Sequence, residues 1–201
     1  MSVLGLLLAA GAGRRMGTPK GLLRDPAGVP FVERAVRVLR DGGCDQVVVV
    51  VGAAAEEVAA LVPDGAIVVT AADWADGMGA SLRRGLCAAQ ASDAGCALVT
   101  LVDLPDVDAA VVRRILDAAG GDPDVLARAA YHGVPGHPVL IGRTHWDGVL
   151  GVASGDRGAR DYLTANPPAL VECGDLASGR DVDRPGDLAP PGSPGRARRP
   201  G

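Results

Sequence analysis

A loop of glycines with two cations follows the first apolar run of the chain. Gly11, Gly13 and Gly17 let the backbone approach a phosphate closely and turn its N–H groups toward it. Arg15 and Lys20 place two positive charges in the same loop. Two cations together with backbone donors suit a triphosphate, whose charge must be neutralised on more than one phosphoryl group. The sequence therefore predicts a nucleoside triphosphate site in this loop.

Lys20 is the only lysine among the 20 basic residues of the chain. A compact ammonium acts as a point charge on a reacting phosphoryl group, where a planar guanidinium fits less well. The alternatives are a solvated loop lysine and a dinucleotide-binding turn, since a glycine pattern alone is a weak signal. Pro19 and the Pro-Ala-Gly turn at 26–28 oppose the long helix that a dinucleotide site requires.

An aspartate, Asp103, follows the apolar run Cys96–Val102. A carboxylate at the carboxyl end of a strand is well placed to hold Mg²⁺, which proteins bind through one or two carboxylates and substrate phosphates. The alternative is a turn residue that caps the next helix, a role that Asp108 fills better. Asp103 is therefore a candidate metal ligand.

The elements that must position these residues are apolar runs alternating with helical patterns. Strands that are apolar throughout and alternate with helices predict an α/β fold with a mostly parallel sheet covered on both faces. Such sheets carry their sites at the carboxyl ends of strands. The predicted strands are Val3–Ala9, Gln46–Val51, Ala66–Thr70, Cys96–Val102, Asp124–Ala129, His137–Ile141 and Ala169–Glu172, and the predicted helices are Phe31–Leu39, Glu56–Val62, Ala80–Ala91, Asp108–Ala119 and Asp156–Ala165.

Length and composition narrow the class of protein. A chain of 201 residues favours one domain, which is predicted over residues 1–188. The Pro- and Gly-rich composition from Pro185 onward predicts a disordered basic tail, and residues 189–201 lie outside the predicted domain. The net charge of −4 argues against a nucleic-acid partner. Aromatic residues are only 2%, which argues against a base-stacking platform.

Targeting signals and metal-binding cysteines are not expected. The apolar segment Val3–Ala10 is too short for a membrane span and has no basic residues before it, so it is not a secretory signal. Four cysteines without zinc-like spacing predict free thiols in a reducing cytoplasm. The sequence thus favours a cytoplasmic enzyme that has no membrane partner.

The stretch Leu8-Ala9-Ala10-Gly11-Ala12-Gly13-Arg14-Arg15-Met16-Gly17-Thr18-Pro19-Lys20 resembles the signature of the molybdenum-cofactor nucleotidyltransferases, which include the molybdopterin cytidylyltransferase and guanylyltransferase. Arg14 stands where the family often has a small residue. The resemblance extends over residues 3–188, with further motifs in the family's order. It implies a single Rossmann-like domain that moves a nucleotidyl group from an NTP to a phosphorylated acceptor and releases pyrophosphate.

The resemblance also implies roles for individual residues. Lys20 and Arg15 would be catalytic, and Asp103 and Asp183 would bind Mg²⁺. The acceptor, molybdopterin or molybdenum cofactor, would meet His137, Arg157 and Arg160, although a backbone-satisfied histidine and a salt-bridged surface turn are the alternatives. CTP is favoured over GTP, because guanylyltransferases have glycine at the position of Ala10. The residues expected to bind the nucleotide are Leu8, Ala10, Gly11, Gly13, Arg15, Lys20 and Ser81, the last of which is alternatively a helix-starting serine.

Three other classes of function stay open. An NAD(P)-dependent oxidoreductase resembling nicotine blue oxidoreductase would use the glycine loop for a dinucleotide. A different nucleotidyltransferase would act on a sugar phosphate or another cofactor. A non-catalytic chaperone would bind a molybdoenzyme, which is also a possible partner of the enzyme itself.

Overall fold

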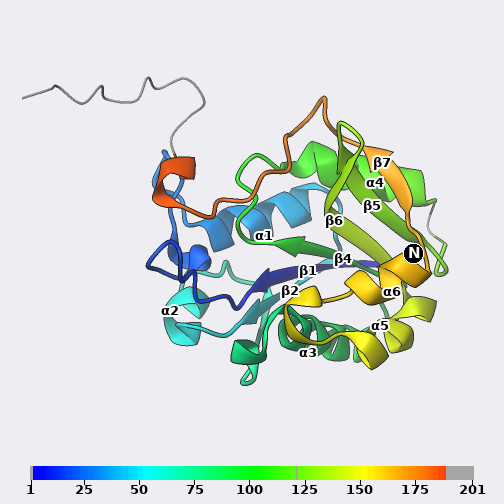
Figure 1. The fold of residues 1–201 in the computed structure, drawn as a ribbon, viewed down its shortest axis with the longest axis horizontal. Helices are drawn as coiled ribbons and strands as arrows, with labels where there is room; N and C mark the ends of the chain where they lie inside the picture. The colour runs from blue at the N-terminus through cyan, green and yellow to red at the C-terminus, as the bar shows by residue number, and fades with distance from the viewer. Residues whose placement is uncertain (1, 121, 189–201) are drawn as a thin grey trace, which may run out of the picture.

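The computed structural model describes residues 2–120 and 122–188, so the predicted tail at 189–201 lies outside the described residues. The described strands form one seven-stranded sheet in the order β3-β2-β1-β4-β6-β5-β7 (Figure 1), in which β6 alone runs against the others. The predicted single α/β domain with a mostly parallel sheet is confirmed. The strands are β1 (Val3–Ala9), β2 (Gln46–Val51), β3 (Ile67–Thr70), β4 (Cys96–Leu101), β5 (Leu126–Tyr131), β6 (Val134–Gly142) and β7 (Ala169–Glu172).

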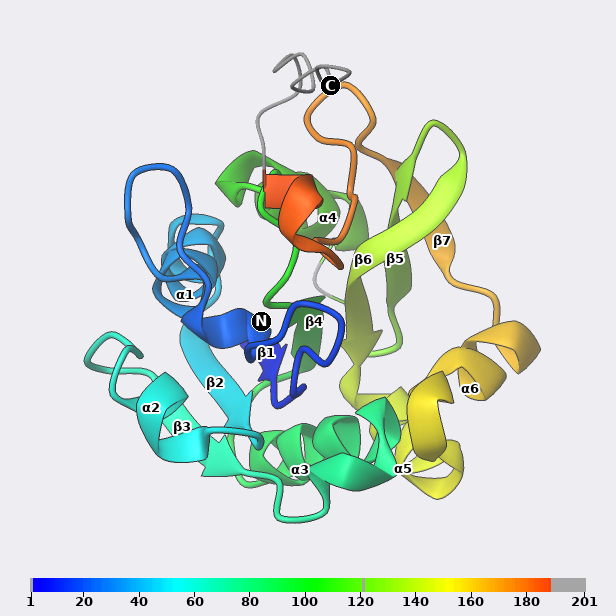
Figure 2. The same cartoon turned by 60° about the vertical axis from the view of Figure 1, so that its left-hand side comes forward.

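Helices cover both faces of the sheet (Figures 1 and 2). On one face α1 and α4 pack their apolar sides against the strands, and on the other face α3 and α5 do so, which gives two separate core clusters. None of the described helices is long and apolar enough to cross a membrane. The α-helices are α1 (Phe31–Asp41), α2 (Ala55–Ala59), α3 (Met78–Gln90), α4 (Ala109–Ala119), α5 (Trp146–Val152) and α6 (Arg160–Ala165).

The strand order reverses between β1 and β4. The chain leaves β1 through α1 toward β2 and β3 on one side, and it returns through α3 to β4 on the other side of β1. In open α/β sheets, ligands bind outside the carboxyl ends of the strands at this switch point. The glycine loop follows β1 and Asp103 follows β4, so both candidate segments lie there.

Two local predictions are wrong. The helix predicted over Asp156–Ala165 is interrupted at Gly158, whose φ of 54° is left-handed, and α6 begins only at Arg160. Helix α5 has no counterpart among the predicted helices, because Gly148 breaks its apolar pattern. A Cβ at Gly148 would lie 2.3 Å from the ring of Tyr162, so the glycine is required for α5 to pack against α6.

The predicted disorder from Pro185 onward is also wrong for the first residues of that segment. A short 3₁₀ helix, η5 (Pro185–Leu188), follows the stretch Asp181-Val182-Asp183, the late acidic motif of the chain. The Asp187 carboxylate accepts hydrogen bonds from the backbone N–H groups of Asp183 and Arg184 (3.0 and 2.8 Å), which folds the chain into this turn. The acidic residues of the motif are therefore held within ordered structure.

Candidate active site

The loop after β1 curls through a glycine turn. The backbone N–H groups of Met16 and Gly17 both donate to the carbonyl of Gly13 (2.8 and 2.9 Å). Gly13 has φ of 58°, and a Cβ there would lie 1.9 Å from the carbonyl oxygen of Thr18. Only glycine fits this position. At Gly11, in contrast, a Cβ would meet nothing within 4 Å, so this glycine leaves its backbone open to a ligand.

Lys20 lies at the start of a 3₁₀ turn, η1 (Lys20–Leu22), and its ammonium joins two carboxylates. The Nζ atom lies 2.6 Å from Oδ2 of Asp103 and 2.6 Å from Oδ1 of Asp183. The lysine side chain is only 18% exposed. Burial by itself would lower the pKa of Lys20, but the hydrogen bonds and charges of the two aspartates outweigh it and raise the pKa above its usual value. Lys20 is therefore a fixed positive charge in this structure.

Asp103 and the late acidic motif meet through the backbone. The N–H of Val182 donates to the carbonyl of Asp103 (2.9 Å), and the Val182 side chain is buried. The aspartates on either side of Val182 alternate to the opposite face of the segment. Carboxylate oxygens of Asp103, Asp181 and Asp183 consequently lie within 4.8 Å of one another.

The two carboxylates that hold Lys20 differ in their environment. Asp103 is buried, and desolvation raises its pKa even though Lys20 opposes the shift. Asp183 is more exposed, and its hydrogen bond from Lys20 lowers its pKa. Arg15 also pairs with Asp183 (3.0 Å) but is 74% exposed. The negative charge of the cluster is thus balanced mainly by one lysine.

The acidic cluster has the donor set of a divalent cation site. Three carboxylates supply oxygen ligands, which Mg²⁺ and Mn²⁺ prefer. Oδ1 of Asp103 is buried and has no hydrogen-bond partner among the described residues, which leaves one oxygen without compensation for its burial. A bound cation would satisfy this oxygen. Asp103 does not cap the following helix, because Asp108 does so by accepting from the N–H groups of Ala110 and Val111.

A cavity of about 350 Å³ opens beside this cluster at the carboxyl ends of the strands. It brings together most of the predicted nucleotide-binding residues, Arg15 excepted. Ser81 is buried there and is not the helix-starting residue, since Gly77 precedes α3. The predicted residues that line the cavity are Leu8, Ala10, Gly11, Gly13, Lys20, Ser81 and Asp103.

A second cavity of about 140 Å³ adjoins the first and shares Leu8, Met78 and Asp156 with it. The three residues predicted for the acceptor, His137, Arg157 and Arg160, all line this second cavity. Arg157 also pairs with Asp161 (2.6 Å). Because α6 begins only at Arg160, the positive charge of this cavity comes from guanidinium groups.

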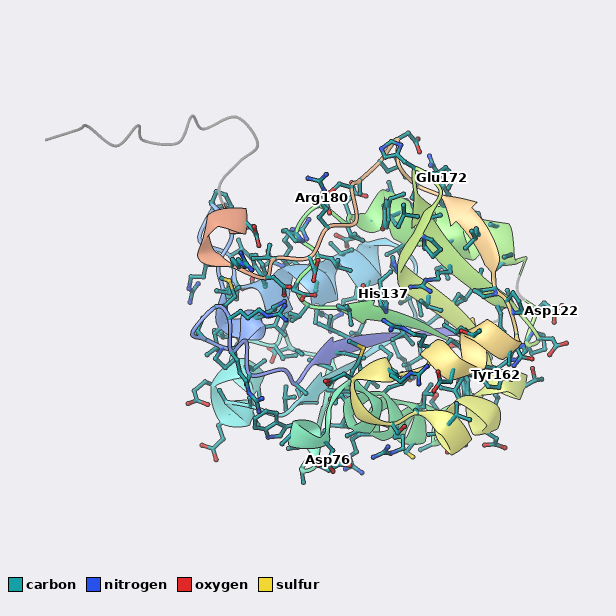
Figure 3. The ribbon with its side chains drawn as sticks, in the orientation of Figure 1. Asp76, Asp122, His137, Tyr162, Glu172 and Arg180 are labelled. Carbon is teal, nitrogen blue, oxygen red and sulfur yellow. The ribbon has the colours of Figure 1, made fainter. Side chains whose placement is uncertain are left out.

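Arg128 is a third arginine in this second cavity, and it was not predicted. It donates from Nε to the carbonyl of Gly136 (2.7 Å), while burial first and the charge of Arg160 second lower its pKa. His137 lies near the centre of the molecule, unlike the peripheral Asp122 and Glu172 (Figure 3). Burial, assisted by the charge of Arg128, lowers the pKa of His137 to about 4. The cavity therefore offers arginine charge and a neutral imidazole at pH 7.

Four residues at these sites were missed or misjudged from the sequence. Asp181 joins the acidic cluster, and its i, i+2 spacing from Asp183 was the available signal. Trp74 lines the first cavity despite the scarcity of aromatic residues. Arg14, which was not among the predicted site residues, lines the cavity, whereas Arg15 does not. Arg128 is a charged residue within an alanine-rich strand, a pattern that carries no local signal of function.

A glycine loop, a lysine and a carboxylate cluster that could hold a divalent cation lie together at the switch point of an α/β sheet, as expected for a nucleotide-binding enzyme. Comparison with known proteins gives the family. Residues 5–170 match the MobA-like NTP transferase domain, and the chain belongs to this family. The chain is accordingly a nucleotidyltransferase, as both its family and its structural neighbours indicate.

Individual relatives cover nearly the whole chain. Nicotine blue oxidoreductase of Paenarthrobacter nicotinovorans is 38% identical over 90% of this chain and 92% of its own length. The crystal structure of Rv0371c from Mycobacterium tuberculosis H37Rv is 31% identical, with a TM-score of 0.75 over 93% of this chain and 95% of that one. A nucleotidyl transferase from Methanothermobacter thermautotroptrophicus is 25% identical, with a TM-score of 0.77 over 92% and 94%.

The Lys20 ammonium occupies the centre of the acidic cluster, so it should compete with a divalent cation. We expect Lys20→Met to bind Mn²⁺ about 10- to 100-fold more tightly than wild type in the absence of nucleotide, because hydrogen bonds to charged groups are worth ~1.5–3 kcal/mol. Calorimetric titration with Mn²⁺ measures the affinity, and Asp103→Asn, which should bind Mn²⁺ more weakly, is the matched control. Unchanged or weaker Mn²⁺ binding in Lys20→Met would contradict the competition.

The depressed pKa of His137 should make folding depend on pH. Between its folded value of about 4 and the ~6.5 of an unfolded histidine, the unfolded chain binds a proton that the folded chain does not, so stability falls as the pH drops through 6.5. We expect wild type to lose roughly 1–2 kcal/mol more unfolding free energy than His137→Gln between pH 7 and 5. Chemical denaturation at both pH values tests this, and equal losses would mean that the imidazole is solvated.

Proposed function

We propose that this enzyme transfers CMP from CTP to the phosphate of molybdopterin or the molybdenum cofactor and releases pyrophosphate. The observation that carries the proposal is the arrangement of two adjoining cavities. One is lined by the glycine loop, Lys20 and Asp103 of the acidic cluster, and the other by three arginines. A phosphorylated acceptor in the second cavity, the arginine cavity, would lie next to a nucleotide in the first, because the two cavities share lining residues.

The proposed roles follow from where the residues lie. Backbone N–H groups at Gly11 and Gly13 hold the triphosphate. Arg14 lines the cavity, and Arg15, which pairs with Asp183 outside that lining, would meet the outer phosphates. Lys20 turns from the carboxylates to the nucleotide and neutralises the charge that grows around the α-phosphate.

The proposed reaction is an in-line displacement. An acceptor phosphate oxygen forms a bond to the α-phosphorus while the bond from that phosphorus to the oxygen bridging the α- and β-phosphates breaks, and pyrophosphate leaves with the electron pair. No general base is required, because the acceptor phosphate is ionised at pH 7. Asp103 and Asp183, with Asp181 beside them, would hold Mg²⁺, which supplies neutralisation of phosphate charge when bound. Support comes from Rv0371c, which was solved as a complex with manganese and is 28% identical in that structure.

The arginine cavity supports an anionic acceptor. Arg128, Arg157 and Arg160 line it together, and Asp156 is the carboxylate among its lining residues. Guanidinium groups bind phosphate through paired N–H donors. A cytoplasmic location is part of the proposal and is supported by the four free cysteines.

Loss of the buried carboxylate should abolish transfer. We expect Asp103→Asn to lower the rate of pyrophosphate release from CTP and molybdopterin about 100-fold or more at low Mg²⁺, with partial recovery at high Mg²⁺ or Mn²⁺. Asp183→Asn should behave similarly, and exposed Asp122→Asn is the control. If wild type releases no pyrophosphate with any nucleoside triphosphate and this acceptor, the proposed reaction is wrong.

The preference for CTP should depend on Ala10. Its methyl group is buried at the cavity and lies near Gly52, where a Cβ would be only 2.8 Å away, so the slot is tightly packed. Overfilling a packed slot costs ~1–3 kcal/mol, which predicts a roughly 5- to 150-fold preference for CTP over GTP. We expect Ala10→Gly to reduce this ratio of kcat/KM. A wild-type preference for GTP would overturn the assignment, whereas unchanged selectivity in Ala10→Gly would remove only this explanation.

A second candidate function is an NAD(P)-dependent oxidoreductase, and the similarity to nicotine blue oxidoreductase favours it. The glycine loop would then hold the pyrophosphate of a dinucleotide. The two functions differ in their ligands and in their need for a cation. Thermal stabilisation by CTP, GTP, ATP, UTP and NADPH, each with and without Mg²⁺, separates them, because stabilisation by NADPH without Mg²⁺ supports only the oxidoreductase.

A further inference from the structure

The order of strands in the sheet distinguishes the two ends of the first cavity, the proposed nucleotide cavity. Trp74 belongs to a 3₁₀ turn, η2 (Trp74–Asp76), after β3 and packs at the end of β2, whereas Asp103 follows β4. Strand β1 lies between β2 and β4, so these ends are two strand spacings apart, roughly 10 Å (Figure 2). The phosphates belong with Lys20 at the β4 side. The base must therefore lie toward the Trp74 side.

Trp74 is held firmly at that end of the cavity. Its backbone N–H donates to the carbonyl of Ala71 (3.2 Å), and Ala71 in turn donates to Val51 at the end of β2 (2.9 Å). A Cβ at Gly52 would lie 2.6 Å from Cβ and 2.7 Å from Cγ of Trp74, so the tryptophan sits directly on the backbone of this glycine. These contacts place the backbone, Cβ and Cγ of Trp74 at the end of β2.

A residue of α3 braces the same turn. Arg83 pairs with Asp73 (3.2 Å) and donates to the carbonyl of Ala153 (2.6 Å), so it links the turn to the segment before Gly155. The turn contributes Trp74 and Ala75 to the lining of the cavity, and Asp156, shortly after the linked segment, lines it as well. This brace further limits how far Trp74 can move.

The indole of Trp74 presents a flat ring face and an Nε1–H hydrogen-bond donor. The side chain is only partly buried against the core cluster, and it lines the cavity. Within the part of the chain that the structure describes, no residue accepts a hydrogen bond from its Nε1. Trp146 provides the contrast, because it is fully buried and donates from Nε1 to the carbonyl of Ile141 (2.9 Å). A flat aromatic ring with a free N–H suits an aromatic ring with acceptor atoms.

We infer that Trp74 forms the wall against which the nucleobase lies and is a specificity-determining residue of the nucleotide site; this rests on the proposed function. The inference also gives Ala10 a physical role. Both Ala10 and Trp74 pack against Gly52 and both line the cavity, so the alanine methyl and the tryptophan side chain form adjacent parts of its wall. A change at either residue alters the room for the base and leaves the phosphates where they are.

Calorimetry with two ligands separates contact with the base from contact with the phosphates. In Mg²⁺ buffer we expect Trp74→Ala to weaken CTP binding about 5- to 100-fold, the range that loss of one stacked aromatic gives, while inorganic tripolyphosphate binds within twofold of wild type. Trp74→Phe, which keeps an aromatic face, should retain CTP affinity within about fivefold. Asp76→Ala changes an exposed residue on the same turn (Figure 3) and should match wild type with both ligands.

Fluorescence gives an independent readout, because the other tryptophan, Trp146, is fully buried. CTP should change the emission of wild type and leave that of Trp74→Phe unchanged. Unaltered CTP affinity in Trp74→Ala, or an equal loss for CTP and tripolyphosphate, overturns the inference, and so does a wild type that binds tripolyphosphate but no nucleoside triphosphate. If the affinities change as expected but no transfer to molybdopterin occurs, the proposed reaction fails and the role of Trp74 stands.

Discussion

One ammonium group joins three segments that lie far apart in the chain. Lys20 follows β1, Asp103 follows β4, and Asp183 belongs to the last described segment, yet Nζ lies 2.6 Å from an oxygen of each aspartate. A buried carboxylate is costly unless a positive charge compensates it. The position of the C-terminal segment over the strand ends therefore depends on a cation at this point. The lysine supplies that charge in this structure, and its retention of the proton follows from the raised pKa.

The sheet topology makes this interaction possible. Because the strand order reverses between β1 and β4, the loops that follow these neighbouring strands diverge and leave a space at their ends. The bond from Val182 to the Asp103 carbonyl then closes one side of the space, and burial of Val182 turns its two neighbouring aspartates the other way. The acidic cluster is thus a consequence of one backbone hydrogen bond and of alternation along an extended segment.

The sequence predicted those features that local signals determine. Apolar runs located all seven strands, and the spacing of glycines and cations singled out the loop at the end of β1, which lines the first cavity. It assigned Arg15 to the nucleotide, whereas the structure places Arg14 in the cavity lining, because the direction of each arginine depends on the left-handed turn at Gly13 and on a partner of Arg15 that lies 168 residues away.

Residues brought together only by tertiary structure were beyond the reach of pattern analysis. Arg128 meets His137 because β5 pairs with β6, and nothing in its own segment marks it. Trp74 reaches the first cavity through a short turn after an edge strand, and contacts with residues distant in the sequence, among them Gly52, fix its direction. Helix α5 was missed for the same reason, since its glycine is explained by the ring of Tyr162 on another helix.

The signs of charge around the two cavities constrain the order of events. Phosphates cannot approach Asp103, Asp181 and Asp183 closely unless the charge of these carboxylates is neutralised, because like charges a few ångströms apart in a partly desolvated site repel strongly. A single lysine cannot both compensate the acidic cluster and stabilise a phosphoryl group at full strength. If Lys20 turns to the nucleotide, another cation has to take its place between the carboxylates. The arginine cavity has no such requirement, since its guanidinium groups exceed its one carboxylate, Asp156. An anion can therefore bind the arginine cavity without a metal, whereas a triphosphate beside the acidic cluster would need a cation that replaces Lys20 between the carboxylates.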